Sequence, residues 1–252
     1  MFSLKNRINE DKFNNDFSYK LLESEKHFDN IYRECSYKFE KGCGSYLFDG
    51  KNYQYIIQTY SKQKLLYEKS KNKENILEIG TYMGHSLLIM LIANPNAKIT
   101  CIDIDDTYSG PATRYLQKEF PNSKIKFIKS DSLKILKNLD EKFDFFHIDG
   151  AHKNKIITKE FNYCMNLRKS DEIEFIFDDV NNCLTLINNI FLFYEVKNKH
   201  FSDSFFNRAL YFSILFPQKK INFFLKKFFF KIKNLIDYIF FKLKKLSKFK
   251  KI

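Results

Sequence analysis

The stretch Ile76-Leu77-Glu78-Ile79-Gly80-Thr81-Tyr82-Met83-Gly84-His85-Ser86 decides the fold class. It reads as a buried strand, a turn with two glycines, and the start of a helix. Gly80 allows a sharp turn, and Gly84 allows the backbone to approach a ligand closely. The free N–H groups of the helix start can bind a phosphate, or the carboxylate of an amino-acid-like ligand. A plain tight turn gives the same glycine spacing, so the glycines alone do not distinguish a ligand-binding turn from an ordinary one.

Short apolar runs and helix-like segments alternate on both sides of this stretch. The apolar runs are 76–79, 99–104, 125–128, 143–148 and 173–177. The helical segments between them are 86–93, 113–120, 133–139 and 156–167. This alternation predicts an α/β protein with a Rossmann-like, doubly wound, mostly parallel sheet and helices on both faces. We also expect a helix within 53–71, another near 184–196 and a closing strand within 205–216.

Three regions follow from the composition: an N-terminal helical segment at 1–70, a central α/β domain at 71–217 and a basic tail at 218–252. The net charge is +13, and residues 219–252 hold twelve lysines against one acid, Asp237. The central body is therefore nearly neutral, which argues against a nucleic-acid-binding domain. The five cysteines form no Cys-x-x-Cys pair, which argues against a disulfide framework or a structural zinc site.

Two polar groups follow the second and third predicted strands. Asp103 ends the second strand, 23 residues after Gly80, where an acid can hydrogen-bond both hydroxyls of a ribose. Asp105 and Asp106 continue as a solvated turn. Asp131 and Ser132 follow the third strand, where they can meet the edge of an adenine, cap the next helix, or do both.

Three acids end the fourth and fifth predicted strands: Asp149, Asp178 and Asp179. Ligand sites of open α/β sheets lie at the carboxyl ends of the strands, so these carboxylates should converge there. Unpaired carboxylates repel one another, and a hard divalent cation such as Mg²⁺ resolves this. One of the last two acids can also cap the helix that follows.

From about residue 53 to 185 the chain resembles the class I S-adenosylmethionine-dependent methyltransferases. Within them it is similar to the metal-dependent O-methyltransferases, a group that contains catechol O-methyltransferase and the macrocin-type sugar O-methyltransferases. The resemblance rests on LEIGTYMGHS, CIDID, SDS, FFHIDGAH and FDDV, in order and at similar spacing. An Asp at position 179 is closer to the sugar-modifying members, because the catechol enzymes often have Asn there.

The resemblance implies a role for each motif. The residues implied around the methionine part of the methyl donor are Glu78, Gly80, Tyr82, Gly84 and Ser86. Asp103 would bind the ribose of S-adenosylmethionine, and Asp131 and Ser132 its adenine. Asp149, Asp178 and Asp179 match the metal ligands, so a divalent cation such as Mg²⁺ would assist attack of a hydroxyl on the methyl group.

The general base departs from the family pattern. Catechol enzymes carry a Lys three residues past the first metal Asp, where this chain has His152, and some sugar-modifying relatives carry an acid at the position of Ala151. We take His152 as the catalytic base alongside Asp149, since a neutral imidazole suits proton removal near pH 7. A solvent-facing turn histidine is the other interpretation. His147 is interpreted as a core histidine, or one that supports the site from behind.

The tail predicts an amphipathic helix, because apolar residues from Ile221 to Leu246 recur every three or four positions among lysines. Such a helix can lie on an anionic membrane, so we expect a cytoplasmic protein attached peripherally to the inner face of a membrane, with a small-molecule or glycan acceptor. A partner helix, or a basic tail that binds nucleic acid non-specifically, are the alternatives. Two rival functions also remain: a non-catalytic membrane-docking adaptor and an RNA methyltransferase.

Overall fold

A computed structural model describes residues 4–36, 57–178, 180–202 and 209–215, together with Phe228 and Ile232. Of the predicted tail, 218–252, only those two residues are described, so the predicted amphipathic helix lies outside the described part of the chain. In the described residues no helix is both long and apolar enough to cross a membrane.

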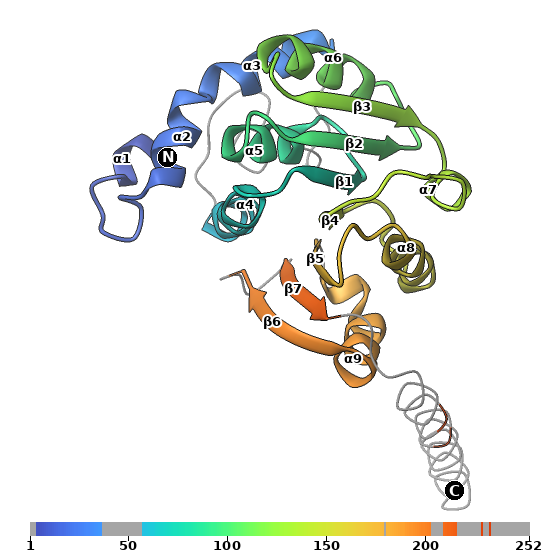
Figure 1. The fold of residues 1–252 in the computed structure, drawn as a ribbon. Helices are drawn as coiled ribbons and strands as arrows, with labels where there is room; N and C mark the ends of the chain where they lie inside the picture. Colours follow the sequence, from blue (N-terminus) through green and yellow to red (C-terminus); the bar gives the residue numbers. More distant parts are fainter. Residues whose placement is uncertain are drawn as a thin grey trace, which may run out of the picture.

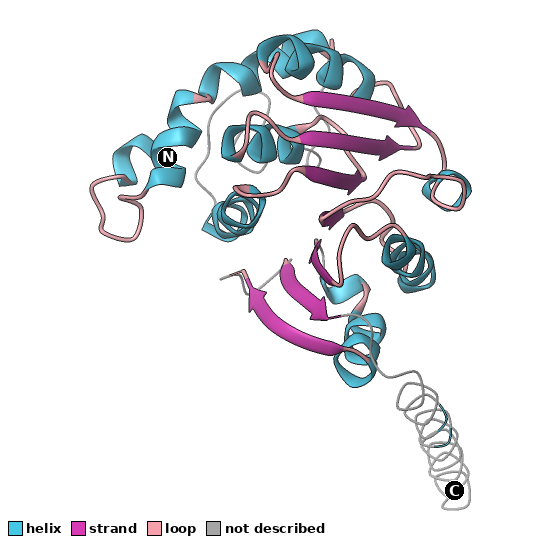
Figure 2. Cartoon of the chain, viewed as in Figure 1, coloured by secondary structure: helices cyan, strands magenta, loops and turns pink. Residues whose placement is uncertain are grey.

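One seven-stranded sheet organises the described chain, with the strand order β3-β2-β1-β4-β5-β7-β6 (Figures 1 and 2). The strands are β1 Asn75–Ile79, β2 Lys98–Asp103, β3 Lys124–Lys129, β4 Phe145–Ile148, β5 Glu172–Phe177, β6 Glu195–Phe201 and β7 Leu210–Leu215. The first five are parallel, β7 runs antiparallel to β5, and β6 runs antiparallel to β7. The predicted Rossmann-like, mostly parallel sheet is therefore confirmed. The strand order reverses between β1 and β4, which is where ligands bind in open α/β sheets.

Helices cover both faces of the sheet. They are α1 Leu4–Arg7, α2 Asp16–Glu23, α3 Glu25–Glu34, α4 Ile57–Ser70, α5 His85–Ala93, α6 Ser109–Glu119, α7 Ser132–Ile135, α8 Asn154–Asn166 and α9 Leu184–Phe193, with a short 3₁₀ turn at Val180–Asn182. Helices α2 to α6 share one apolar core with strand residues such as Ile76 and Ile99. Helices α8 and α9 share the opposite core with Leu77, Phe146 and Phe175. Alternate residues of each strand thus enter opposite cores, which explains why the strands read as continuous apolar runs.

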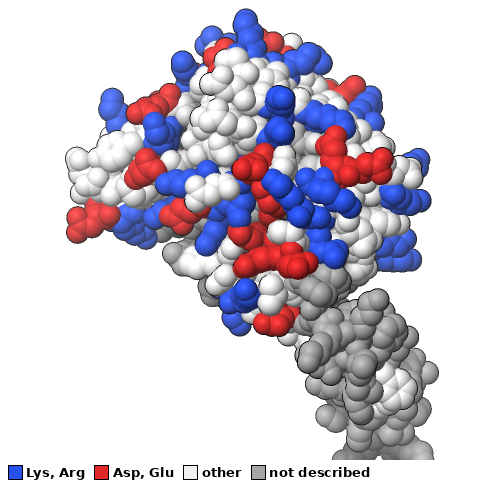
Figure 3. Space-filling model, in the orientation of Figure 1, with Lys and Arg blue, Asp and Glu red and all other residues white. Residues whose placement is uncertain are grey.

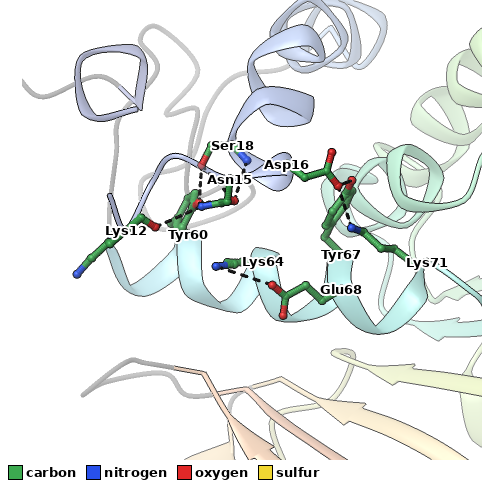
Figure 4. A network of polar contacts seen from close by, with 9 residues as sticks. All are labelled: Lys12, Asn15, Asp16, Ser18, Tyr60, Lys64, Tyr67, Glu68 and Lys71. Atoms are coloured by element: carbon green, nitrogen blue, oxygen red, sulfur yellow. Dashed lines mark hydrogen bonds and ion pairs between the residues drawn. The ribbon is translucent and has the colours of Figure 1, made fainter. Parts of the chain in front are cut away.

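Helix α2 and its N-cap Asn15 dock onto α4 through polar contacts (Figure 4). The hydroxyl of Tyr60 on α4 lies 2.5 Å from that of Ser18 and 3.0 Å from Nδ2 of Asn15. About two turns further along α4, Tyr67 donates to the carboxylate of Asp16 at 2.7 Å. These contacts hold α2 against α4, and α4 is the helix that closes one side of the cavity described below.

The predicted helix and closing strand near the end of the described chain are both present, and one strand between them was missed. The helix predicted to reach residue 196 ends at Phe193, and an unpredicted strand, β6, occupies Glu195–Phe201. Most side chains of β6 are exposed, so it lacks the apolar run that marked the other strands. The predicted closing strand corresponds to β7, and residues 205–208 and 216 of that prediction lie outside the described residues.

Candidate active site

A cavity of about 650 Å³ opens where the carboxyl ends of β1 to β5 meet α4 and α8. It brings together motifs that lie up to 98 positions apart in the sequence. The sequence-predicted residues on its wall are Gly80, Tyr82, Ser86, Asp103, Asp131, Ser132, Asp149, His152 and Asp178. A cavity of this size suits a ligand of nucleoside dimensions.

The turn after β1 requires its first glycine. Gly80 has a φ of +87°, and a Cβ there would lie 2.6 Å from the Cα of Gly150 and even nearer the carbonyl of Asp149. The ends of β1 and β4 can therefore approach only because residue 80 has no side chain. Tyr82 also has a positive φ, +45°, which a bulky residue rarely adopts. Backbone strain of this kind clusters at ligand sites.

Asp103 fixes the shape of this turn. Its Oδ2 accepts hydrogen bonds from the backbone N–H groups of Thr81 at 2.9 Å and Tyr82 at 2.7 Å. Its Oδ1 accepts from the N–H of Asp105 at 3.1 Å. An ionised carboxylate has about four acceptor sites, so Asp103 retains capacity for a ligand hydroxyl.

Glu78 and Gly84 are described residues that do not line the cavity. Glu78 is fully buried, and its Oε1 accepts from Ser86 Oγ at 2.5 Å and lies 3.2 Å from Nδ1 of His147. It thereby links the cavity residues Ser86 and His147 from behind. Gly84 has a φ of +72° and is the N-cap of α5, with Ala112 so close that a Cβ would crowd it. Both residues support the turn from outside the cavity wall.

Asp131 caps α7, since its Oδ1 accepts from the N–H of Leu133 at 2.8 Å. Ser132 donates its hydroxyl to Glu160 Oε1 at 2.5 Å. Glu160 is only 1% exposed, and burial, followed by the charge of Asp131, raises its pKa although the Ser132 bond lowers it. This corner of the cavity therefore combines a capping carboxylate with a buried acid that favours its neutral form.

Asp149 and Asp178 meet at the neighbouring ends of β4 and β5, where the N–H of Asp178 bonds the carbonyl of Ile148 at 3.0 Å. Both carboxylates line the cavity, and Lys62 Nζ lies 2.5 Å from Asp178 Oδ1. Asp179 lies outside the described residues. Among the residues that the structure does describe, no cluster of three or more His, Cys, Asp or Glu could hold a metal ion. The two described carboxylates are hard oxygen donors, which suit Mg²⁺.

The three histidines on the wall differ in their surroundings. His152 is exposed, with Nδ1 3.4 Å from the amide Nδ2 of Asn182. His147 is buried against Glu78, as expected for a histidine that supports the site. His85 starts α5 beside the ring of Phe28, and burial lowers its pKa to about 3.

Lys62, His85 and Glu160 are cavity residues that the sequence analysis did not identify. Glu160 gives a sequence signal, because it shares the apolar stripe of its helix with Ile157 and Cys164. His85 likewise begins an otherwise apolar helix. Lys62 gives none, because only the docking of α4 onto the sheet brings it to Asp178.

Comparison with known proteins agrees with this geometry. A sequence model of the O-methyltransferase family matches residues 61–182, which contain every candidate site residue. The chain is 39% identical over 86 residues to an Arabidopsis thaliana sequence assigned as a caffeoyl-CoA O-methyltransferase, covering 32% of this chain and 37% of that one. It is 30% identical over 95 residues to the caffeoyl-CoA O-methyltransferase of Stellaria longipes, covering 35% and 39% respectively. The chain thus spans well under half the length of these curated relatives.

Solved structures share the fold. The O-methyltransferase TomG from Streptomyces achromogenes, solved in complex with S-adenosylmethionine, superposes with a TM-score of 0.55 at 16% identity, covering 79% of this chain and 96% of that one. At this identity the likeness supports the fold alone. By sequence, residues 61–182 of the chain are similar to the O-methyltransferase family.

Proposed function

We propose that this protein is an S-adenosylmethionine-dependent O-methyltransferase. One observation carries the proposal: a single cavity joins the glycine turn, Asp103, the Asp131–Ser132 corner, and Asp149 and Asp178 at the ends of neighbouring strands. The first three would bind the donor, and the last would bind the acceptor beside it. Positioning two reactants in this way lowers the barrier by removing the entropic cost of their encounter.

Different residues on the cavity wall would bind different parts of S-adenosylmethionine. Asp103 would accept hydrogen bonds from the ribose hydroxyls, since the turn amides leave part of its acceptor capacity unused. Ser86 and the N–H groups at the start of α5 would face the methionine carboxylate. Asp131 and Ser132 would lie against the adenine, with Glu160 orienting the Ser132 hydroxyl.

Asp149 and Asp178, with Asp179 beyond the described residues, would hold a divalent cation such as Mg²⁺. When bound, such a cation lowers the pKa of an acceptor hydroxyl and fixes its geometry. His152, exposed at the mouth of the cavity, would take the hydroxyl proton as general base. The contact with the Asn182 amide would orient its ring.

The acceptor class that we propose is a hydroxyl of a sugar or glycan, in keeping with the acid at position 179. The two relatives described above carry names that refer to caffeoyl-CoA, a phenolic thioester. A screen with sugar and phenolic acceptors in parallel separates the two classes. Methylation confined to the phenolic set would contradict the glycan proposal and leave the O-methyltransferase proposal standing.

Isothermal titration with S-adenosylmethionine, with and without Mg²⁺, is the primary test. We expect micromolar binding that Asp103→Ala abolishes and Asp106→Ala preserves. Asp106 is a fair control because it lies on the same turn and pairs with Lys129 at the surface. Absence of binding by the unaltered protein would favour a non-catalytic adaptor instead.

An RNA methyltransferase is the other rival. Lysines, arginines and acids are interspersed over the described part of the face in Figure 3, so this face offers no continuous basic track. RNA binding that is strongly salt-dependent and survives removal of the tail would contradict our proposal.

We further propose that residues 219–252 attach the protein to the inner, anionic face of a membrane. The support is the sequence alone, with twelve lysines interleaved with Phe and Leu. Flotation with anionic liposomes should recover the full chain, and should not recover a chain that ends at Pro217. Equal behaviour of the two would remove this proposal.

A further inference from the structure

Lys62 and Asp178 form a buried ion pair on the wall of the cavity. Lys62 Nζ lies 2.5 Å from Asp178 Oδ1, and the two side chains are only 7% and 8% exposed. The next lysine of the same helix, Lys64, is 35% exposed and pairs with Glu68 one turn further along, at 3.8 Å (Figure 4). Lysine is almost never buried unless it is paired, so the position of Lys62 needs an explanation.

The partner of Lys62 is one of the carboxylates at the proposed metal site. An ammonium group in contact with Asp178 compensates the charge of that carboxylate without any metal. A divalent cation at the same carboxylate would bring two positive charges within a few ångströms of each other in a poorly solvated site. The two cations therefore compete for Asp178.

We propose that Lys62 is a built-in counter-ion that holds Asp178 in the metal-free protein and must leave it before a divalent cation binds. This rests on the proposed metal site of the O-methyltransferase. The lysine stem is long and flexible, and the adjoining cavity gives its end room to move. The protein thus has two charge-balanced states, and the ammonium weakens the affinity for the metal.

The test is titration of the full chain with Mn²⁺. Binding is monitored by calorimetry or by the electron paramagnetic resonance signal of free Mn²⁺. We expect Lys62→Met to bind Mn²⁺ at least about tenfold more tightly than the unaltered protein, because the competing charge is gone. Lys62→Arg, which retains the charge, and Lys64→Met, which removes an exposed lysine from the same helix, should both bind like the unaltered protein. Asp149→Asn supplies the baseline for binding elsewhere on the chain.

Unchanged or weaker Mn²⁺ binding by Lys62→Met would overturn the proposal. Since that variant removes the ion pair of the buried Asp178, its thermal unfolding is measured as well. Mn²⁺ should raise its melting temperature more than that of the unaltered protein, and an equal or smaller rise would also overturn the proposal. Titration of the same samples with S-adenosylhomocysteine, the product of the methyl donor, distinguishes failure of the Lys62 proposal from failure of the proposed function. Binding of S-adenosylhomocysteine without any effect of Lys62→Met on Mn²⁺ binding would refute the role of Lys62 and retain the donor site.

Discussion

His85 should make the protein lose stability between pH 7 and pH 5. Burial lowers its pKa to about 3, whereas an unfolded chain gives histidine a pKa of about 6.5. Between these values the unfolded chain binds the proton and the folded chain does not. The stabilising contribution is therefore complete above pH 6.5 and is lost progressively as the pH falls.

The size of the effect follows from this window. A pH of 5 lies about 1.5 units below the pKa of histidine in the unfolded chain. Each pH unit corresponds to about 1.36 kcal/mol, so the free energy of unfolding should be about 2 kcal/mol lower at pH 5 than at pH 7. His85→Asn, which cannot titrate, should lack this part of the pH dependence. Its free energy of unfolding relative to the unaltered protein should rise by about 2 kcal/mol on going from pH 7 to pH 5.

Urea unfolding at both pH values, followed by far-ultraviolet circular dichroism, measures this difference. Any constant cost of the substitution cancels, because only the change with pH is compared. His200→Asn is the control, since that imidazole is exposed on β6 and meets water in the folded and unfolded chain alike. Parallel pH dependence of His85→Asn and the unaltered protein would refute the reasoning.

Three further predictions concern stability. Gly80→Ala should destabilise the protein by about 3 kcal/mol or more, because the new Cβ would meet the backbone just after β4. Gly110→Ala, inside α6 with only ordinary neighbours, is the control and should not. Chemical denaturation of both variants measures the difference in the free energy of unfolding. Burial raises the pKa of Glu160, so the stability of the protein falls as the pH rises from about 4.5 towards the pKa of the folded state. The stability of Glu160→Gln relative to the unaltered protein should therefore increase between pH 4 and pH 7. A stability difference between the two that does not change with pH would contradict this. Tyr60→Phe should cost about 1–2 kcal/mol and more than Tyr67→Phe, because its hydroxyl partners are the more buried; equal melting temperatures would contradict it (Figure 4).

The parallel half of the fold could be predicted because β1, β2, β4 and β5 are mostly buried, and the edge strand β3 is half-buried. Each apolar run has to be continuous when helices cover both sides of a sheet, and β1 to β5 all lie within about two residues of the predicted ranges. β6 carries Lys197, Lys199 and His200 and is mostly exposed, so it has no such run. Pairing with β7 makes this segment a strand, and that pairing cannot be seen in the local pattern.

The candidate site was predictable where it follows strand ends and was missed where helices supply it. Asp103, Asp149 and Asp178 follow predicted strands, so their convergence on one cavity was expected. Lys62 and Glu160 come from α4 and α8, and the way these helices dock decides which of their side chains reach the wall. A lysine on an amphipathic helix is usually solvated, so the sequence pattern gave no reason to single out Lys62.

The bonds from Asp103 to Thr81 and Tyr82 have a consequence for binding kinetics and entropy. The turn that would receive the donor is already ordered before any ligand arrives, so association requires little rearrangement and loses little backbone freedom. Asp103→Ala removes this order together with the ligand contact. Asp103→Asn retains a carbonyl oxygen that can accept from the turn amides. The difference in association rate between the two variants would therefore measure how much the preformed turn contributes to recognition.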